Sequence, residues 1–147
     1  MRLLNSANVE YLLIGGYAVG CHGYVRYTDD IDFWVAVTAG NLQSVRDVLV
    51  KFGFPAAAVP DPLFTQSIQI LRIGRPPNKL ELFSMIPGVD FDSCYQRRDI
   101  VTLEDGLVVN VLSYSDLIAS KLAGARPKDL ADVDELEKIH RRKTKPR

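Results

Sequence analysis

The stretch YLLIGGYAVGCHGYVRYTDDIDFWVAV, residues 11–37, carries most of the information about the fold. It begins with the apolar run Tyr11–Ile14, which predicts a strand that ends at a Gly-Gly pair. It closes on Ile31–Val37, which is rich in aromatic and β-branched residues and predicts a buried strand. A short helix over residues 17–23 is expected between them. The stretch therefore predicts two neighbouring strands joined by a helix.

Two carboxylates, Asp30 and Asp32, stand at the start of the second strand. Side chains at positions i and i+2 of a strand project from the same face, so these two are expected side by side. Such a pair repels unless a cation lies between the carboxylates or one takes a proton. Oxygen ligands suit Mg²⁺ or Mn²⁺, and Gly15-Gly16 offers backbone N–H groups to a phosphate. The combination indicates phosphoryl or nucleotidyl transfer.

The chain has the composition of an ordinary one-domain globular protein, with 147 residues of which 47% are hydrophobic and 24% charged. Its apolar runs reach only about five residues, far short of the ~20 that a membrane span needs. Cys21 and Cys94 have no metal-ligand spacing and are expected to be reduced and buried. No signal pattern is present, so we expect a cytoplasmic protein with no membrane contact.

The net charge is zero, but it is unevenly distributed. The last ten residues, KIHRRKTKPR, contain six Lys or Arg and no acid, which leaves the rest of the chain with a net charge of −6. We therefore divide the chain into a domain, residues 1–140, and a basic tail, residues 141–147. Such a tail either contacts nucleic-acid phosphates or is a solvated, frayed terminus.

The remaining chain alternates between helical and strand patterns. Thr38 is expected to cap a helix, and Ser113 with Asp116 resembles a capping box. The expected elements are a helix over 41–52, a hairpin of strands 67–73 and 79–83, a short helix over 91–98, a hairpin of strands 100–103 and 107–112, and helices over 113–124 and from Pro127 to about His140. This order predicts an α+β (mixed α/β) domain with one mixed sheet and helices packed on it.

The motif GG-x13-DID, followed by an apolar strand, resembles the signature of the DNA polymerase β nucleotidyltransferase superfamily. The longer string GGYAVGCHGYVRYTDDIDFWV and the C-terminal string DLIASKLAGARPKDLADVDEL look like a bacterial subgroup related to abortive-infection toxin–antitoxin enzymes. That subgroup is more distantly similar to lincosamide and aminoglycoside nucleotidyltransferases. The resemblance covers residues 11–136 and implies the nucleotidyltransferase fold.

The resemblance implies a role for each matching residue. Gly15 and Gly16 would form the phosphate-binding turn, and Lys121 would reach the triphosphate. Asp30 and Asp32 would be catalytic carboxylates that bind two Mg²⁺ ions, or Mn²⁺. A packing role at the edge of the core is the alternative for Lys121.

The third carboxylate of the superfamily best matches Glu81, which lies between apolar neighbours on the expected strand 79–83. Glu81 would bind metal and orient or deprotonate the attacking hydroxyl. Superfamily members often carry Asp here, and the alternative is that Glu81 faces water on a half-exposed strand. Asp90 and Asp92 are the rival third acids.

The implied activity is metal-dependent transfer of a nucleoside monophosphate from a nucleoside triphosphate, such as ATP, to a hydroxyl acceptor. The acceptor would be a tRNA end, a protein side chain or a small molecule. Two alternatives stay open. The chain could be a catalytically silent, antitoxin-like binding module, or the nucleotidyl half of a two-component system with a separate helical protein partner.

Overall fold

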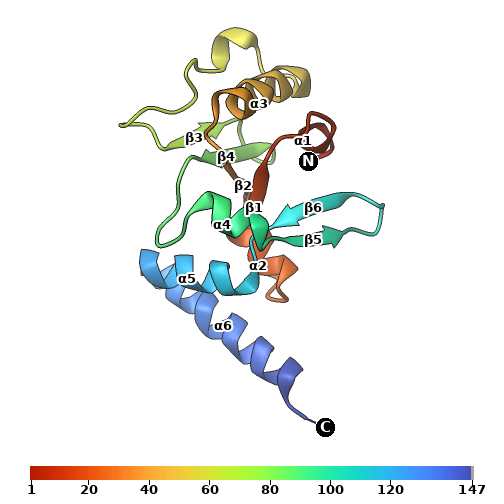
Figure 1. Cartoon of the computed structure of the whole chain (residues 1–147). Coiled ribbons are helices and arrows are strands. Elements are labelled where there is room, and N and C mark those ends of the chain that lie inside the picture. The colour runs from red at the N-terminus through yellow and green to blue at the C-terminus, as the bar shows by residue number, and fades with distance from the viewer. Residues whose placement is uncertain (147) are drawn as a thin grey trace.

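The computed structural model describes residues 1–146 and contains one mixed six-stranded sheet with helices around it, as the sequence predicted (Figure 1). The strands are β1 (Tyr11–Ile14), β2 (Asp30–Val35), β3 (Ile70–Ile73), β4 (Lys79–Phe83), β5 (Asp99–Thr102) and β6 (Val108–Val111). They lie in the order β3-β4-β2-β1-β6-β5. The pairs β2–β4 and β1–β6 are parallel, and the other three pairs are antiparallel.

The helices are α1 (Arg2–Ser6), α2 (Gly15–Cys21), α3 (Ala39–Phe52), α4 (Phe91–Gln96), α5 (Tyr114–Gly124) and α6 (Pro127–Thr144), with a 3₁₀ turn, η1, at Ala56–Ala58. In Figure 1, α1 and α3 lie at one end of the molecule and the α5–α6 pair lies at the other. In the same view, α2, which lies in the connection between β1 and β2, is in the part of the molecule where α5 and α6 lie.

Local signals explain where the longer helices begin. The Thr38 side chain accepts a hydrogen bond from Asn41 N at the start of α3, and Ser113 does the same for Asp116 N at the start of α5. Pro127 occupies the first turn of α6, where its missing N–H costs nothing. The caps at Thr38 and Ser113 are those predicted, but α3 begins at Ala39, two residues before the expected start at 41.

The core lies where β1 and the second half of β2 meet α3. Tyr11, Leu12 and Val35 are fully buried, and Trp34 is nearly so. The Trp34 indole packs edge-on against Phe91 with 5.1 Å between ring centroids. This packing fixes the C-terminal end of β2. The two acids at the N-terminal end of β2 are therefore carried by a rigid strand.

Three expectations are corrected. The strand expected over 67–73 begins only at Ile70. Cys21 is exposed, because it ends the short helix α2, whereas Cys94 is buried as expected. The last helix continues to Thr144, because no breaker stands at His140, and Arg147 of the expected tail lies outside the described residues. Within residues 1–146, no helix combines the length and apolar character needed to cross a membrane.

Candidate active site

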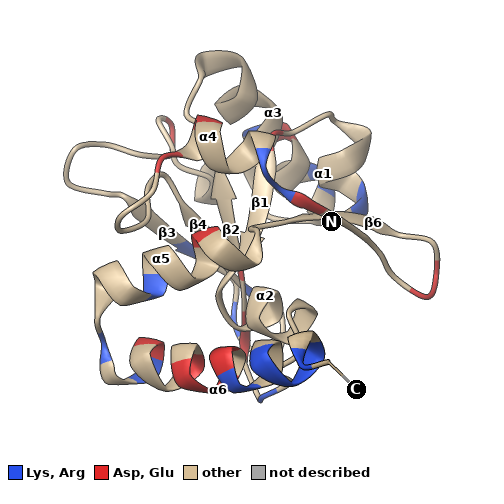
Figure 2. Cartoon of the chain, turned by 60° about the horizontal axis from the view of Figure 1, so that its bottom comes forward, with Lys and Arg blue, Asp and Glu red and all other residues tan. Residues whose placement is uncertain are grey.

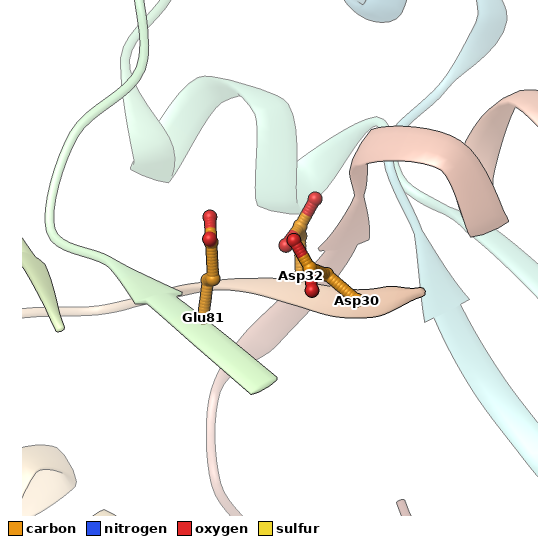
Figure 3. A group of neighbouring side chains, drawn as sticks. All are labelled: Asp30, Asp32 and Glu81. Atoms are coloured by element: carbon orange, nitrogen blue, oxygen red, sulfur yellow. The ribbon is translucent and has the colours of Figure 1, made fainter. Parts of the chain in front are cut away.

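Three carboxylates from two neighbouring strands meet on one face of the sheet (Figure 3). Asp30 and Asp32 lie on β2, and the parallel register places Glu81 of β4 opposite Asp32. One oxygen of each side chain lies within 4.8 Å of the other two. The structure therefore brings together the three acids that the sequence singled out, in a geometry that a metal ion can bridge.

The position of the acids follows from the pattern of β2. The first three residues of the strand are half-buried and the next three are buried. Ile31 and Phe33 project to the face opposite the acids and pack on the core. The carboxylates thus stand where the strand emerges from the core, partly shielded from water but reachable from outside.

Gly15 makes room for Asp32. Ile14 pairs with Asp32 across β1 and β2, and a Cβ on Gly15 would overlap the Asp32 Oδ2 atom. The φ of Gly15 is +68°, a region that L side chains rarely adopt. Gly16 lies as close to Thr28, since a Cβ on Gly16 would be 2.8 Å from the Thr28 Cβ. The two glycines are the first residues of α2 rather than a turn that precedes it.

Asp32 has a strongly perturbed acidity. Burial, which is the largest cause, and the nearby carboxylates of Glu81 and Asp30 together raise its pKa to about 6. The positive charges of Lys128 and Lys121 act in the opposite direction but are weaker. Without a cation, the site therefore opposes full ionisation of its own acids near neutral pH.

Two carboxylate oxygens of the site, Asp30 Oδ1 and Asp32 Oδ1, are buried without a hydrogen-bond donor among residues 1–146. Buried acceptors without partners cost about 1–3 kcal/mol each unless water or a cation meets them. Ligand oxygens around one six-coordinate Mg²⁺ lie about 3–4 Å apart, so the spacing at this site needs only a small side-chain rotation. The residues present therefore fit a hard divalent cation.

Two cations from the β3–β4 hairpin border the acids. Lys79 Nζ lies 3.3 Å from Asp30 Oδ1, an ion-pair distance outside hydrogen-bond geometry, and 3.9 Å from Glu81 Oε1. Arg72 Nε donates to Glu81 Oε1 at 3.0 Å. Neither residue is among the site residues predicted from the sequence. The signal for Lys79 was present, because it precedes Glu81 by two residues on the same strand face.

Lys121 lies beside the acids but is already paired. It is 9% exposed, donates from Nζ to Asp132 Oδ2 at 2.9 Å, and lies 3.6 Å from Asp129 Oδ1. Arg26 donates to both oxygens of Asp132, and Arg126 donates to both oxygens of Asp129. Three cations thus face two carboxylates. The sequence contained no local signal for the contact of Arg26 with Asp132.

The two rival acids, and the histidine nearest to the motif in the sequence, lie outside the site. Asp90 and Asp92, the rival third acids, are exposed at the start of α4, where Asp90 accepts a hydrogen bond from Ser93 N. His22 Nε2 lies 2.7 Å from Leu112 O, which fits a hydrogen-bonded residue at a helix end. Neither observation connects these residues to the three carboxylates.

A cleft of about 750 Å³ opens beside Asp32. One part of its wall carries charge, and another part is apolar. Its lining residues include Gly15, Asp32, Arg72, Lys121 and Arg126 on the charged part, and Ile68, Ile70, Phe83, Met85 and Ile86 on the apolar part. Ile68, Ile70 and Met85 are exposed, so the cleft offers apolar surface to a ligand.

Three solved structures show that this is a nucleotidyltransferase fold. An antigenic nucleotidyltransferase-like protein from Paracoccidioides brasiliensis is 19% identical, with a TM-score of 0.56 over 94% of this chain and 72% of its own. The lincosamide antibiotic adenylyltransferase LnuA, solved with lincomycin bound, is 15% identical, with a TM-score of 0.60 over 94% and 92%. A protein from Thermotoga maritima described as a nucleotidyltransferase is 16% identical, with a TM-score of 0.57 over 95% and 85%.

Sequence comparison places the chain more narrowly. A family model described as a nucleotidyltransferase of unknown function (DUF6036) matches residues 1–142, and the chain belongs to this family. No protein with a curated description matches the sequence. At identities below 20%, the similarity to the solved structures shows the fold, whereas the family match shows that the chain is of the nucleotidyltransferase kind.

Proposed function

We propose that this protein is a metal-dependent enzyme that transfers a nucleoside monophosphate from a nucleoside triphosphate to a hydroxyl acceptor. The observation that carries the proposal is the convergence of Asp30, Asp32 and Glu81 beside an open cleft in a chain of the nucleotidyltransferase family. A purely structural cluster of acids would be expected to be fully paired, whereas Asp32 Oδ1 is buried with neither a hydrogen-bond donor nor an ion pair among the described residues.

Asp30, Asp32 and Glu81 would hold Mg²⁺ or Mn²⁺. A bound divalent cation neutralises negative charge on the phosphates and lowers the pKa of a hydroxyl. The register of β2 and β4 fixes the positions of the three carboxylates, and these positions determine where the cation would bind. The mutual repulsion of the acids, visible in the raised pKa of Asp32, favours cation binding.

The phosphates of the nucleotide would lie between Gly15-Gly16 and the charged cluster that contains Lys121 and Arg126. The first N–H groups of α2, at Gly15 and Gly16, have no side-chain cap, and the two glycines carry no Cβ of their own. Lys121 and Arg126 belong to a cluster with one more cation than carboxylates, and both line the cleft. This surplus of positive charge would attract the triphosphate, although Lys121 would have to share its charge with Asp132.

The reaction itself forms a bond between the acceptor oxygen and the α-phosphorus. The bond from the α-phosphorus to the bridging oxygen breaks, and pyrophosphate leaves with its electron pair. Glu81 would orient the acceptor hydroxyl and accept its proton. Most of the rate enhancement would come from placement and charge neutralisation, because this chemistry needs no covalent participation by the protein.

The apolar wall of the cleft, with exposed Ile68, Ile70 and Met85, suits an acceptor or a base with an apolar face. A small molecule is one acceptor class to test, since the related fold of LnuA acts on a lincosamide antibiotic. A tRNA end and a protein side chain, including that of a toxin partner, are the others. A role in a toxin–antitoxin pair and a cytoplasmic location remain predictions from the sequence.

Transfer of label tests the proposal directly. The protein is incubated with each α-³²P-labelled triphosphate and a cell lysate that is separated into small-molecule, RNA and protein fractions. We expect Mg²⁺-dependent label in one fraction, absent with EDTA or with Asp32→Asn. A catalytically silent binding module would bind nucleotide or partner but transfer no label under any condition, and that result would contradict the proposal.

A further inference from the structure

Lys79 occupies a special place at the edge of the carboxylate group. It pairs with Asp30 in the parallel register of β2 and β4, and it precedes Glu81 by two residues on the same strand. Its ammonium lies 3.3 Å from Asp30 Oδ1 and 3.9 Å from Glu81 Oε1. One positive charge therefore bridges carboxylates that come from two different strands.

The strand register, rather than chance, holds this bridge in place. Side chains two residues apart on a strand point the same way, so the stem of Lys79 runs alongside that of Glu81. The Lys79 side chain is 28% exposed, against 63% for Arg72, which contacts Glu81 from β3. Lys79 is thus the more enclosed of the two cations, and it is the one that contacts two acids of the site.

Asp32 lies on the other side of the group. Its carboxylate faces Gly15 and the cleft, and its Oδ1 atom has no donor among the described residues. We call the side between Asp30 and Glu81 the outer side and the side at Asp32 the inner side. The Lys79 ammonium already occupies the outer side, whereas no cation pairs with Asp32 among the described residues. The group is therefore asymmetric in charge, with room for a cation at one side only.

The charge balance leads to the same conclusion. Before a nucleotide binds, the three carboxylates carry −3 when ionised and Lys79 with Arg72 supplies +2, so one divalent cation more than neutralises the remaining charge of the protein's own groups. Two-metal sites hold their ions about 3.5–4 Å apart, bridged by shared carboxylates. A second ion on the outer side of the group would have to displace the Lys79 ammonium from Asp30 and Glu81.

We propose that the Lys79 ammonium takes the place of one of the two divalent cations, so that the site binds a single ion on its Asp32 side. This inference rests on the proposed metal-dependent function and departs from the two Mg²⁺ ions that the sequence resemblance implied. An ammonium has three N–H donors. The Lys79 ammonium lies near Asp30 and Glu81 as an ion pair without a hydrogen bond to either, so its N–H groups can donate to a phosphate oxygen and the side chain can act as a fixed counter-charge.

Counting bound Mn²⁺ by electron paramagnetic resonance tests the inference without relying on turnover. The full chain is titrated with Mn²⁺ in the presence of a triphosphate analogue that cannot be cleaved between the α and β phosphates. We expect one Mn²⁺ per chain, with the spectrum of an isolated ion. Lys79→Met, checked for folding by its thermal melt, should bind two, with the exchange-coupled spectrum of ions about 3.5–4 Å apart.

Two control variants separate position from charge. Lys79→Arg keeps a cation between the acids and should still bind one Mn²⁺. Arg75→Met removes an exposed charge from the turn of the same hairpin and should also bind one. A coupled pair of ions in the unaltered protein, or one ion in Lys79→Met, would overturn the role of Lys79. Absence of any bound Mn²⁺ in both proteins would overturn the metal-dependent function itself.

Discussion

Glu81 of β4 lies opposite Asp32 of β2 in a parallel register, and its carboxylate is one of the two that raise the pKa of Asp32. The strands that carry them are held by core residues such as Trp34 and Leu82, so the two acids cannot easily move apart. The fold therefore holds negative charges together at a cost in stability. This repulsion should affect the stability of the protein in ways that can be measured.

The stability of the metal-free protein should fall as pH rises. The folded-state pKa of Asp32, about 6, lies above its ordinary value of 3.8, so folding favours the protonated form. The contribution of Asp32 is fully present below pH 4 and is lost as pH rises through about 6. After allowance for solvent screening, we expect a loss of about 1–2 kcal/mol between pH 4 and pH 8.

Urea denaturation in EDTA at several pH values measures this loss. Asp32→Asn keeps the shape of the side chain but not its charge, so its unfolding free energy should lack this pH dependence. Asp29→Asn is the matched control, since Asp29 is exposed and adjacent in the sequence. Identical pH profiles for wild type and Asp32→Asn would show that Asp32 is not perturbed.

Gly15→Ala should damage the site, whereas Gly20→Ala should not. A Cβ at Gly15 overlaps Asp32 Oδ2 and requires a positive φ, so we expect a loss of about 1–3 kcal/mol in stability together with weaker Mn²⁺ binding. Gly20 lies in the same helix with nothing within 4 Å, and Ala there should stabilise by about 0.5–1 kcal/mol. Equal effects in the thermal melts and Mn²⁺ titrations of both variants would contradict this account of Gly15.

Lys121→Met should affect both stability and nucleotide binding. Asp132 and Asp129 keep Arg26 and Arg126 as partners, so the loss of Lys121 should cost about 1–3 kcal/mol rather than unfold the protein. Affinity for a triphosphate should fall more than affinity for the monophosphate, because the lost charge acts on the distal phosphates.

Calorimetric titration with ATP and AMP tests this difference. The control is Lys138→Met, which removes an exposed lysine from ion pairs with Asp134 and Glu135 and should change stability by less than about 0.5 kcal/mol. Equal losses for ATP and AMP in Lys121→Met would leave Lys121 with a structural role only.

The basic end of α6 should not contribute to nucleotide binding. Figure 2 shows acidic residues along the middle of α6 and basic residues at its end. Arg141 lies 15 residues after Arg126, or roughly 22 Å along the helix. Replacing Arg141, Arg142 and Lys145 by Gln should leave ATP affinity unchanged in calorimetry. A salt-dependent fall in RNA labelling would instead identify these residues as an acceptor contact.

Much of the fold could be predicted because its signals are local. The strands Tyr11–Ile14 and Lys79–Phe83 match β1 and β4, since the first is an apolar run that ends at a glycine and the second alternates charged and apolar residues directly after a turn. The strand order could not be predicted, because it depends on pairings between distant segments, such as β1 with β6. The early start of α2 was missed, since glycine is a poor helix former and reads as a turn.

The residues of the candidate site also divide into those with a local signal in the sequence and those whose contacts depend on the pairing of distant segments. Asp30 and Asp32 lie together because they share one strand, and Glu81 was found through resemblance to a known pattern. The contact of Arg72 with Glu81 depends on the pairing of β3 with β4, and the contact of Lys79 with Asp30 depends on the pairing of β4 with β2, so neither could be predicted from one segment. Only the proximity of Lys79 to Glu81 on one strand had a local signal.

The central claim is that Asp30, Asp32 and Glu81 bind a divalent cation that the nucleotide requires. Its most direct test is calorimetric titration of a non-cleavable triphosphate into the protein with Mg²⁺, with EDTA, and into Asp32→Asn with Mg²⁺. The account predicts affinity at least about tenfold higher for the wild type with Mg²⁺ than in the other two conditions, equivalent to about 1.4 kcal/mol. Equal affinity in all three would contradict it.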